Sequence, residues 1–255
     1  MKTGLASVTF RKLAPAEIVK LAAQAGLDGI EWGGDAHVPP GDLEAARTVR
    51  DMTARAGLAV ASYGSYYRAG KSAGEGLVFE TVLATARALG APIVRAWAGT
   101  QASAEVSPES RAALAAELRR LGDAARAEGI LVALEFHSRT LTDTAESAAQ
   151  LMRETEHPHV RLYWQPPVGR AGDECCADLR RLAGYLTHLH VQSHDPISRA
   201  RQSLAAGAPA WRRYLEIAAA SPAARHYALL EFVAGGTMQQ FLEDAAVLRR
   251  LAAAI

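Results

Sequence analysis

Cysteine is almost absent from this chain. Its 255 residues include only Cys175 and Cys176, which are adjacent. Neighbouring cysteines do not easily form an ordinary disulfide and do not match metal-ligand spacing, so we interpret them as free thiols in a reducing compartment. The chain also lacks any run of about 18 apolar residues, and its beginning, MKTGLASVTF, lacks the apolar core of a secretion signal. These absences predict a cytoplasmic protein that does not bind membranes.

An excess of charge of either sign is also missing. The chain has 28 Lys and Arg residues against 27 Asp and Glu residues, which gives a formal net charge of +1. Such a chain has no overall field to attract nucleic acid. No linker divides residues 1–255, so length and composition predict one globular domain. The oligomeric state, including a homo-oligomer, is left open by the sequence.

Short apolar runs alternate with longer amphipathic stretches along the whole chain, which is typical of βαβ units around a parallel sheet. Eight strands are predicted, at Lys2–Val8, Gly29–Trp32, Ala59–Tyr63, Ile93–Trp97, Leu131–Phe136, Val160–Trp164, Leu186–Val191 and Tyr227–Phe232. Eight helices are predicted, at Pro15–Ala25, Asp42–Ala56, Gly76–Leu89, Pro108–Glu128, Thr144–Glu154, Cys175–Ala183, Trp211–Ala219 and Met238–Ala254.

The number of these units in about 250 residues predicts an α/β fold, a single-domain (β/α)8 TIM barrel. An open doubly wound sheet is the alternative, but no Gly-x-Gly-x-x-Gly fingerprint follows the first strand. Three turn-rich segments, Gly33–Gly41, Gly64–Gly74 and Ser193–Pro209, begin where predicted strands end. In a barrel such loops form the rim that carries the active site.

Polar side chains stand at the carboxyl ends of the predicted strands. They are Glu31, Ser62, Arg95, Glu135, His137, Gln165, His190, Gln192 and Glu231. A buried charge must be paired, hydrogen-bonded or bound to a metal, and any one of these residues alone has a structural explanation. The prediction of a site therefore depends on equivalent positions of the fifth to eighth strands, namely Glu135, Gln165, His190 and Glu231. Their oxygen and nitrogen donors suit one divalent ion, Mn²⁺, Mg²⁺, Co²⁺ or Zn²⁺.

The segments LEFH, LYWQPP, HLHV and LLEFV, with AGLDGIEWGG near the start, resemble the xylose isomerase-like TIM barrel superfamily. More narrowly, they resemble its sugar phosphate isomerase/epimerase branch, over nearly the whole chain. The resemblance implies a metal-dependent isomerase or epimerase of a sugar, ketose or cyclic polyol. It implies metal ligands at Glu135, Gln165, His190 and Glu231, with the two glutamates as acid and base.

The sequence departs from this family pattern at Gln165, where the family usually has an aspartate, and at Val168, where a histidine often follows. A glutamine offers an amide oxygen to a cation but no charge. The metal would then have two anionic ligands in place of three, so we expect weaker metal binding. We expect the small-molecule substrate to contact Glu31, His37, Arg95, His137 and Trp164.

Other functions remain compatible with the same barrel. A dehydratase of the inosose or dehydroshikimate type abstracts a similar proton and then expels a β-hydroxyl, with His37 or His137 as the acid. A non-catalytic sugar-binding barrel with a degraded metal site is another alternative. An endonuclease IV-like enzyme is disfavoured because the chain is neutral and has few strand-end histidines. The turn AGGT at residues 234–237 either holds a phosphate or is a simple turn.

Overall fold

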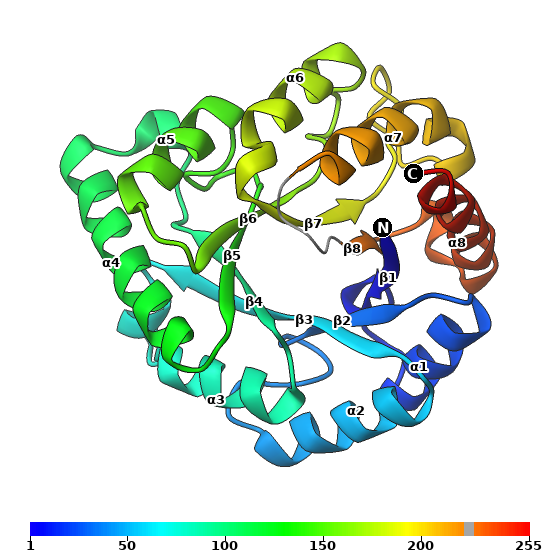
Figure 1. Cartoon of the computed structure of the whole chain (residues 1–255), viewed down its shortest axis with the longest axis horizontal. Helices are drawn as coiled ribbons and strands as arrows, with labels where there is room; N and C mark the ends of the chain where they lie inside the picture. Colours follow the sequence, from blue (N-terminus) through cyan, green and yellow to red (C-terminus); the bar gives the residue numbers. More distant parts are fainter. Residues whose placement is uncertain (222–226) are drawn as a thin grey trace.

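The predicted closed barrel is present in the computed structural model, which describes residues 1–221 and 227–255. Eight parallel strands pair in chain order, and β8 returns to pair with β1 (Figure 1). The strands are β1 (Lys2–Ala6), β2 (Gly29–Gly33), β3 (Ala59–Ala69), β4 (Ile93–Ala98), β5 (Leu131–Glu135), β6 (Val160–Trp164), β7 (Leu186–Val191) and β8 (Tyr227–Leu230). Because all strands run the same way, their carboxyl ends meet at one end of the barrel.

A ring of helices surrounds the strands (Figure 1). The helices are α1 (Pro15–Gln24), α2 (Leu43–Arg55), α3 (Phe79–Leu89), α4 (Pro108–Ala127), α5 (Ala145–Thr155), α6 (Asp173–Leu182), α7 (Leu204–Ala219) and α8 (Met238–Ala253). Pro108 starts α4 directly after Ser107, whose hydroxyl accepts a hydrogen bond from the Ser110 amide. Gly90 ends α3 with a φ of 74°, a backbone conformation that costs other residues about 1–2 kcal/mol.

Side-chain alternation along the strands separates two apolar layers. Outward-facing residues such as Leu189 and Val191 belong to the large core between the strands and the helices. A smaller apolar cluster lies inside the barrel, made of Ala61, Ile93, Ala133, Tyr163, Tyr227 and Leu229. It occupies much of the barrel interior below the carboxyl ends, so polar side chains gather above an apolar floor.

Two predicted loops are shorter than the sequence suggests. β3 continues to Ala69, because a bulge between Gly64 and Tyr67 takes up the extra residues in its pairing with β4. α7 begins at Leu204 rather than Trp211, because the Ser203 hydroxyl caps its first turn by accepting a hydrogen bond from the Ala206 amide, and the carboxylate of Asp244 accepts one from the Leu204 amide at 2.8 Å. Smaller differences affect β1, β8 and α3, which are two to three residues shorter than predicted.

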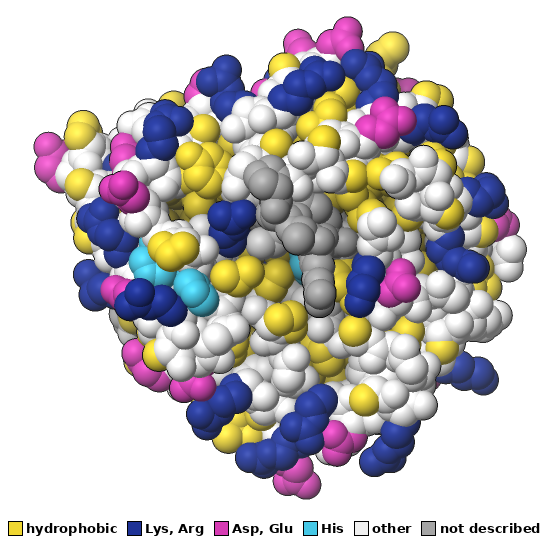
Figure 2. Space-filling model, in the orientation of Figure 1, with side chains coloured by type: hydrophobic (Ala, Val, Ile, Leu, Met, Phe, Trp, Pro, Cys, Tyr) yellow, Lys and Arg dark blue, Asp and Glu magenta, His cyan; other side chains and the backbone are white. Residues whose placement is uncertain are grey.

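The end of the barrel at which the strands begin carries charges of both signs. Figure 2 looks onto this end, and Lys and Arg side chains are interspersed with Asp and Glu across it. Both cysteines lie in α6, buried and unpaired, which confirms the prediction of free thiols. In the described ranges, no helix combines the length and apolar character needed to cross a membrane.

Candidate metal and substrate site

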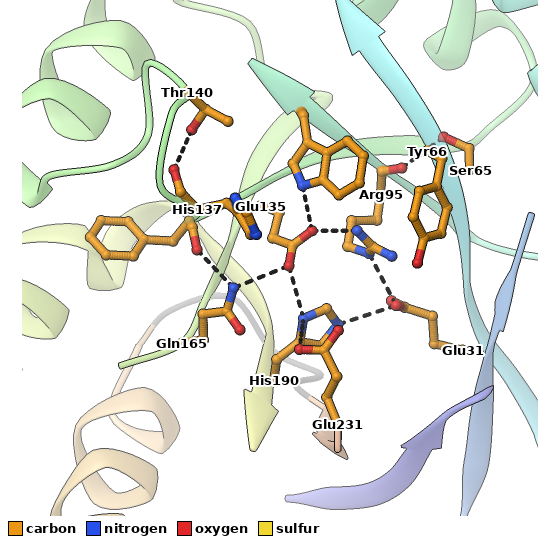
Figure 3. A network of polar contacts seen from close by, with 12 residues as sticks. Glu31, Ser65, Tyr66, Arg95, Glu135, His137, Thr140, Gln165, His190 and Glu231 are labelled. Carbon is orange, nitrogen blue, oxygen red and sulfur yellow. Dashed lines mark hydrogen bonds and ion pairs between the residues drawn. The ribbon is translucent and has the colours of Figure 1, made fainter. Parts of the chain in front are cut away.

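The four predicted metal ligands come together at the carboxyl ends of β5 to β8 (Figure 3). Glu135 is the last residue of β5 and His190 lies one residue before the end of β7, while Gln165 and Glu231 directly follow β6 and β8. These positions face the barrel axis, so their side chains converge. All four are at least nine-tenths buried.

Glu135, His190 and Glu231 form a compact cluster of two carboxylates and one imidazole. One ligand atom of each residue lies within 4.8 Å of those of the other two. Nδ1 of His190 is 3.4 Å from Oε1 of Glu135 and also 3.4 Å from Oε2 of Glu231. Two carboxylate oxygens and an imidazole nitrogen around one point are a donor set that divalent ions accept.

Glu31 lies on the opposite side of the His190 ring and orients it. Nε2 of His190 is 3.1 Å from Oε1 of Glu31. Because a carboxylate only accepts hydrogen bonds, Nε2 carries the proton in this contact and Nδ1 faces the cluster. Ser62 donates a further hydrogen bond to Glu31 at 2.8 Å. A histidine held by a carboxylate in this way is typical of metal sites, and it gives Glu31 a supporting position beneath the cavity in place of the predicted substrate contact.

Arg95 connects Glu31 with Glu135. Its Nε is 3.0 Å from Oε1 of Glu31, and its Nη1 forms a short ion pair with Glu135. The rings of Tyr66 and Trp97 lie 5.4 and 5.6 Å from the guanidinium carbon. Nε1 of Trp97 also donates to Oε2 of Glu135 at 2.7 Å. Glu135 is therefore held by several donors at once.

The two glutamates of the cluster have opposite pKa shifts. Burial raises the pKa of Glu135, but the charges of Arg95 and His190 outweigh burial and hold the pKa of this carboxyl well below its usual range. Burial together with the charge of Glu135 keeps the pKa of Glu231 above its usual range, although His190 acts in the other direction. No Lys or Arg of the described segments lies within ion-pair distance of Glu231.

One divalent cation would balance the net charge of the buried network. Glu31, Glu135 and Glu231 contribute three negative charges and Arg95 one positive charge, so −3 + 1 leaves −2. Without a cation, burial lowers the pKa of His190, but the charges of Glu231 and Glu31 raise it to about 10, so a protonated imidazole offsets part of this charge. A divalent ion on Nδ1 would displace that proton and neutralise the network. Donor set and charge both fit such an ion.

Gln165 does not turn its amide oxygen toward the cluster. Its Nε2 donates to the carbonyl oxygen of Phe136 at 3.0 Å and to Oε1 of Glu135 at 3.1 Å. Its oxygen accepts a hydrogen bond from Nε2 of Gln192 at 2.6 Å. The Phe136 carbonyl needs a donor, so this network sets the orientation of the amide. In this arrangement the amide nitrogen of Gln165 supports the carboxylate of Glu135.

Gln192 holds the amide oxygen of Gln165, a role that was not predicted from the sequence. It follows His190 by two residues and continues the inward-facing series of β7. The sequence shows a polar residue at a strand end, and the alternation of side chains along β7 predicts that it faces inward like His190. Its partner Gln165 could not be identified without coordinates.

Two predicted substrate contacts lie away from the cluster. Trp164 points outward from β6, is fully buried, and packs edge-on against Tyr214 with ring centroids 5.2 Å apart. His37 is 6% exposed, with Nδ1 3.0 Å from the Ser7 hydroxyl and Nε2 3.1 Å from the Leu13 carbonyl. Both ring nitrogens of His37 are thus occupied, which gives it a structural position in the fold.

A cavity of about 890 Å³ opens above the cluster, and its size is in the range of small-molecule sites. Glu135 and Glu231 form part of its wall, together with two of the predicted substrate contacts, Arg95 and His137. His137 is exposed and lies with its ring centroid 5.8 Å from that of Trp97. A ligand in this cavity would reach the carboxylates and these aromatic faces together.

Known proteins match the chain over most of its length. The family model described as the xylose isomerase-like TIM barrel matches residues 19–251. A curated 3-dehydroshikimate dehydratase from Bacillus anthracis is 24% identical over 205 residues, which cover 76% of this chain and 72% of that protein.

Two solved structures share the architecture. The probable 3-DHS dehydratase involved in petrobactin synthesis from Bacillus anthracis has a TM-score of 0.80 and 19% identity, covering 98% of this chain and 99% of the other. The 3-keto-D-glucoside 4-epimerase from E. coli has a TM-score of 0.75 and 19% identity, covering 98% and 99%. At these identities the structures show a common fold, and they include both a dehydratase and an epimerase. In agreement with the resemblance in its sequence, the chain belongs to the xylose isomerase-like TIM barrel family.

Proposed function

We propose that the protein is a metal-dependent enzyme that removes a proton next to a carbonyl group of a small sugar, ketose or cyclic polyol. The observation that carries this proposal is the cluster of Glu135, His190 and Glu231, which belongs to a buried network of net negative charge and whose two glutamates lie in the wall of a ligand-sized cavity. These three residues would hold one ion, Mn²⁺, Mg²⁺, Co²⁺ or Zn²⁺. Such an ion supplies a Lewis acid that polarises the substrate carbonyl.

Glu231 is the better general base of the two glutamates. Glu135 accepts hydrogen bonds from Arg95, Trp97 and Gln165, and its lowered pKa makes it a weak base. Glu231 has a raised pKa and lies in the cavity wall. No Lys or Arg of the described segments lies within ion-pair distance of Glu231, so its carboxylate is less engaged than that of Glu135 and can take a proton from a substrate in the cavity. We therefore assign proton abstraction to Glu231 and assign Glu135 to metal binding.

With Glu231 as the single base, isomerisation is favoured over epimerisation. Inversion at one carbon requires removal of a proton on one face and its return on the other, which needs two groups. Isomerisation between neighbouring carbons needs only one group, because the same carboxyl that takes the proton can return it to the next carbon. The geometry therefore supports isomerisation better than epimerisation.

Dehydration is the second candidate, and His137 is the observation that favours it. Nδ1 of His137 lies 2.8 Å from the Ser138 carbonyl oxygen, so Nε2 is the nitrogen that a substrate can reach in the cavity. A protonated His137 could donate a proton to a leaving β-hydroxyl after Glu231 has removed the neighbouring proton. The similarity to dehydratases in sequence and in structure supports the same outcome.

Incubation of the metal-loaded protein with ketoses, inososes and 3-keto sugars in D₂O tests the proposal. We expect deuterium on the carbon next to the carbonyl, and mass spectrometry then distinguishes isomerisation from loss of water. Glu231→Gln should slow the exchange by about 10²–10⁴-fold at matched metal content. Glu135→Gln should lower metal content first and exchange only in proportion to it.

Two results would contradict this assignment. Exchange that persists in metal-loaded Glu231→Gln would remove Glu231 as the base. A metal-loaded protein that catalyses neither exchange nor water loss across the whole panel would instead support a sugar-binding barrel without catalysis.

A further inference from the structure

The lining of the cavity is strongly cationic. Among the described residues, six cationic side chains line it, Arg11, Arg68, Lys71, Arg95, Arg139 and Arg201. Only two carboxylates line it, Glu135 and Glu231. A divalent ion at the cluster would make this imbalance larger. The opposite end of the barrel, where charges of both signs are mixed (Figure 2), shows no comparable segregation.

Three of these cations lack a carboxylate partner. Arg11 is paired with Asp35 at 2.7 Å, and Lys71 is paired with Glu75 at 3.2 Å. In residues 1–221 and 227–255, no Asp or Glu lies within ion-pair distance of Arg68, Arg139 or Arg201. We call these three residues the cationic rim. Its charge is not compensated by acidic side chains of the described protein.

Aromatic faces hold two of the rim arginines in place. The guanidinium carbon of Arg68 lies 4.8 Å from the ring centroid of Trp97, and that of Arg201 lies 5.0 Å from the ring centroid of Phe232. A guanidinium over a ring points its N–H groups sideways, so its edge stays available to an acceptor. Phe232 has a φ of 54°, an uncommon conformation for a bulky residue, and it follows Glu231 directly.

Arg139 is positioned by a tightly bonded turn. Its φ of 59° costs a residue with a side chain about 1–2 kcal/mol. The turn is fixed by the Thr140 hydroxyl, which donates to the His137 carbonyl at 2.7 Å, and by the Thr142 hydroxyl, which donates to the Glu135 carbonyl at 2.5 Å. The turn that carries Arg139 is thereby tied to the strand that carries Glu135.

We propose that Arg68, Arg139 and Arg201 form an anion subsite that binds a carboxylate or phosphate group of the substrate. Guanidinium groups bind both of these groups through paired N–H donors. The inference rests on the proposed function for the location of the reacting end, at Glu135, His190 and Glu231, and it adds the charge class of the substrate. A neutral sugar would leave the rim without a partner, whereas an anionic sugar or polyol acid would satisfy both ends of the cavity.

Inorganic phosphate and acetate are the first probes, titrated into metal-free protein and followed by the Nε–H NMR signals of the three arginines. We expect the three signals to move together with one dissociation constant. Arg68→Gln, Arg139→Gln and Arg201→Gln should each weaken binding on the order of 10-fold. Arg126→Gln, an exposed change of the same charge on α4, should leave it unaltered. Binding should weaken at about 1 M salt, where the Debye length falls to about 3 Å.

Matched ligands then identify the charged group. Fructose 6-phosphate is compared with fructose, and shikimate with its methyl ester, in wild-type protein and in the rim variants. Tighter binding of one charged member, lost in the rim variants, supports a phosphate or a carboxylate respectively. The proposal is overturned if neither phosphate nor acetate shifts the rim signals, or if Arg126→Gln weakens binding as much as the rim variants do. Deuterium exchange, measured on both neutral and anionic keto sugars with the metal-loaded protein, tests the proposed function separately, because exchange on any of them supports that function whether or not anions bind at the rim.

Discussion

Glu135 and Glu231 show how position separates two identical side chains. Both are buried at strand ends and both contact His190 at 3.4 Å. Of these two glutamates, only Glu135 accepts hydrogen bonds from Arg95 and Trp97, which stabilise its carboxylate and lower its pKa. Neighbours on β4 thus give the two glutamates different pKa values.

His37 leads to a prediction about stability and pH. Burial lowers the pKa of His37 below its usual value, despite its hydrogen bond to the Leu13 carbonyl. Near pH 6.5 the unfolded chain then takes up a proton more readily than the native protein does. His37 should therefore lower the free energy of unfolding as the pH falls below about 6.5, by at most about 1.4 kcal/mol per pH unit.

Urea unfolding of wild-type protein and His37→Gln between neutral and mildly acidic pH measures this effect. The variant should be less stable at neutral pH, because it loses bonds to Ser7 and Leu13, yet its stability should fall less steeply with acid. Parallel curves for the two proteins would show that His37 is not kept neutral by the fold.

The sequence predicted which residues form the candidate site better than it predicted how their side chains are oriented. Glu135, His190 and Glu231 were predicted from polar positions at strand ends, and the structure brings them together. The direction of the Gln165 amide depends on the Phe136 carbonyl and on Gln192, which come from other strands. No local pattern encodes such long-range contacts.

Among the elements, β3 carries a glycine that the network requires. A Cβ atom at Gly64 would lie 2.7 Å from Nη2 of Arg95 and 3.2 Å from Oε1 of Glu31. Arg95 cannot move away easily because Glu31 and Glu135 hold it. We expect Gly64→Ala to lower the free energy of unfolding by about 1–3 kcal/mol and to weaken metal binding.

Gly74→Ala is the matched control for this change, because a Cβ atom there meets nothing within 4 Å. Denaturant unfolding and metal titration should show little change for this control. A Gly64→Ala variant with unaltered stability and metal affinity would show that Arg95 can shift without cost.

The start of α7 depends on a side chain from α8. Asp244 is 3% exposed and accepts hydrogen bonds from the Leu204 amide at 2.8 Å and from Nε2 of Gln240 at 2.9 Å. Asp244→Ala removes this acceptor and should cost about 1–2 kcal/mol, with faster hydrogen exchange in the first turn of α7. Asp244→Asn keeps an oxygen at this place and should restore most of the loss. Equal losses in both variants would argue against this capping contact.

Element boundaries were predictable where local signals agree. Val160–Trp164 and Leu186–Val191 were predicted without error, because apolar runs there are bounded by polar or turn residues. The predicted start of α7 was wrong, since Pro209 and its neighbours indicate a loop, whereas Ser203 caps the helix locally and Asp244, 40 residues away, accepts a further hydrogen bond from Leu204. Tertiary contacts override local propensity in such segments.

For the whole molecule, a divalent ion should raise thermal stability, because it binds the folded barrel and not the unfolded chain. At 100 times its dissociation constant, an ion adds about 2.7 kcal/mol, which corresponds to about 5–10 °C in Tm for a chain of this size. Calorimetry with Mn²⁺, Mg²⁺, Co²⁺ and Zn²⁺ against chelator-treated protein measures the shift and ranks the ions.

Glu135→Gln should lose most of this metal-dependent shift, whereas Glu44→Gln, an exposed change on α2, should keep it. The same shift in both variants would place the ion somewhere other than the cluster.

The polar network draws on strands from both halves of the chain, with Glu31 and Arg95 early in the sequence and His190 and Glu231 late. A fragment must run from β2 to beyond β8 to contain all of these residues, and Glu231 leaves the ribosome after the others. Its place is fixed only when β8 pairs with β1. An ion held by this cluster would therefore enter in the final step of biogenesis, because a nascent barrel stalled before β8 lacks Glu231 and has no complete site.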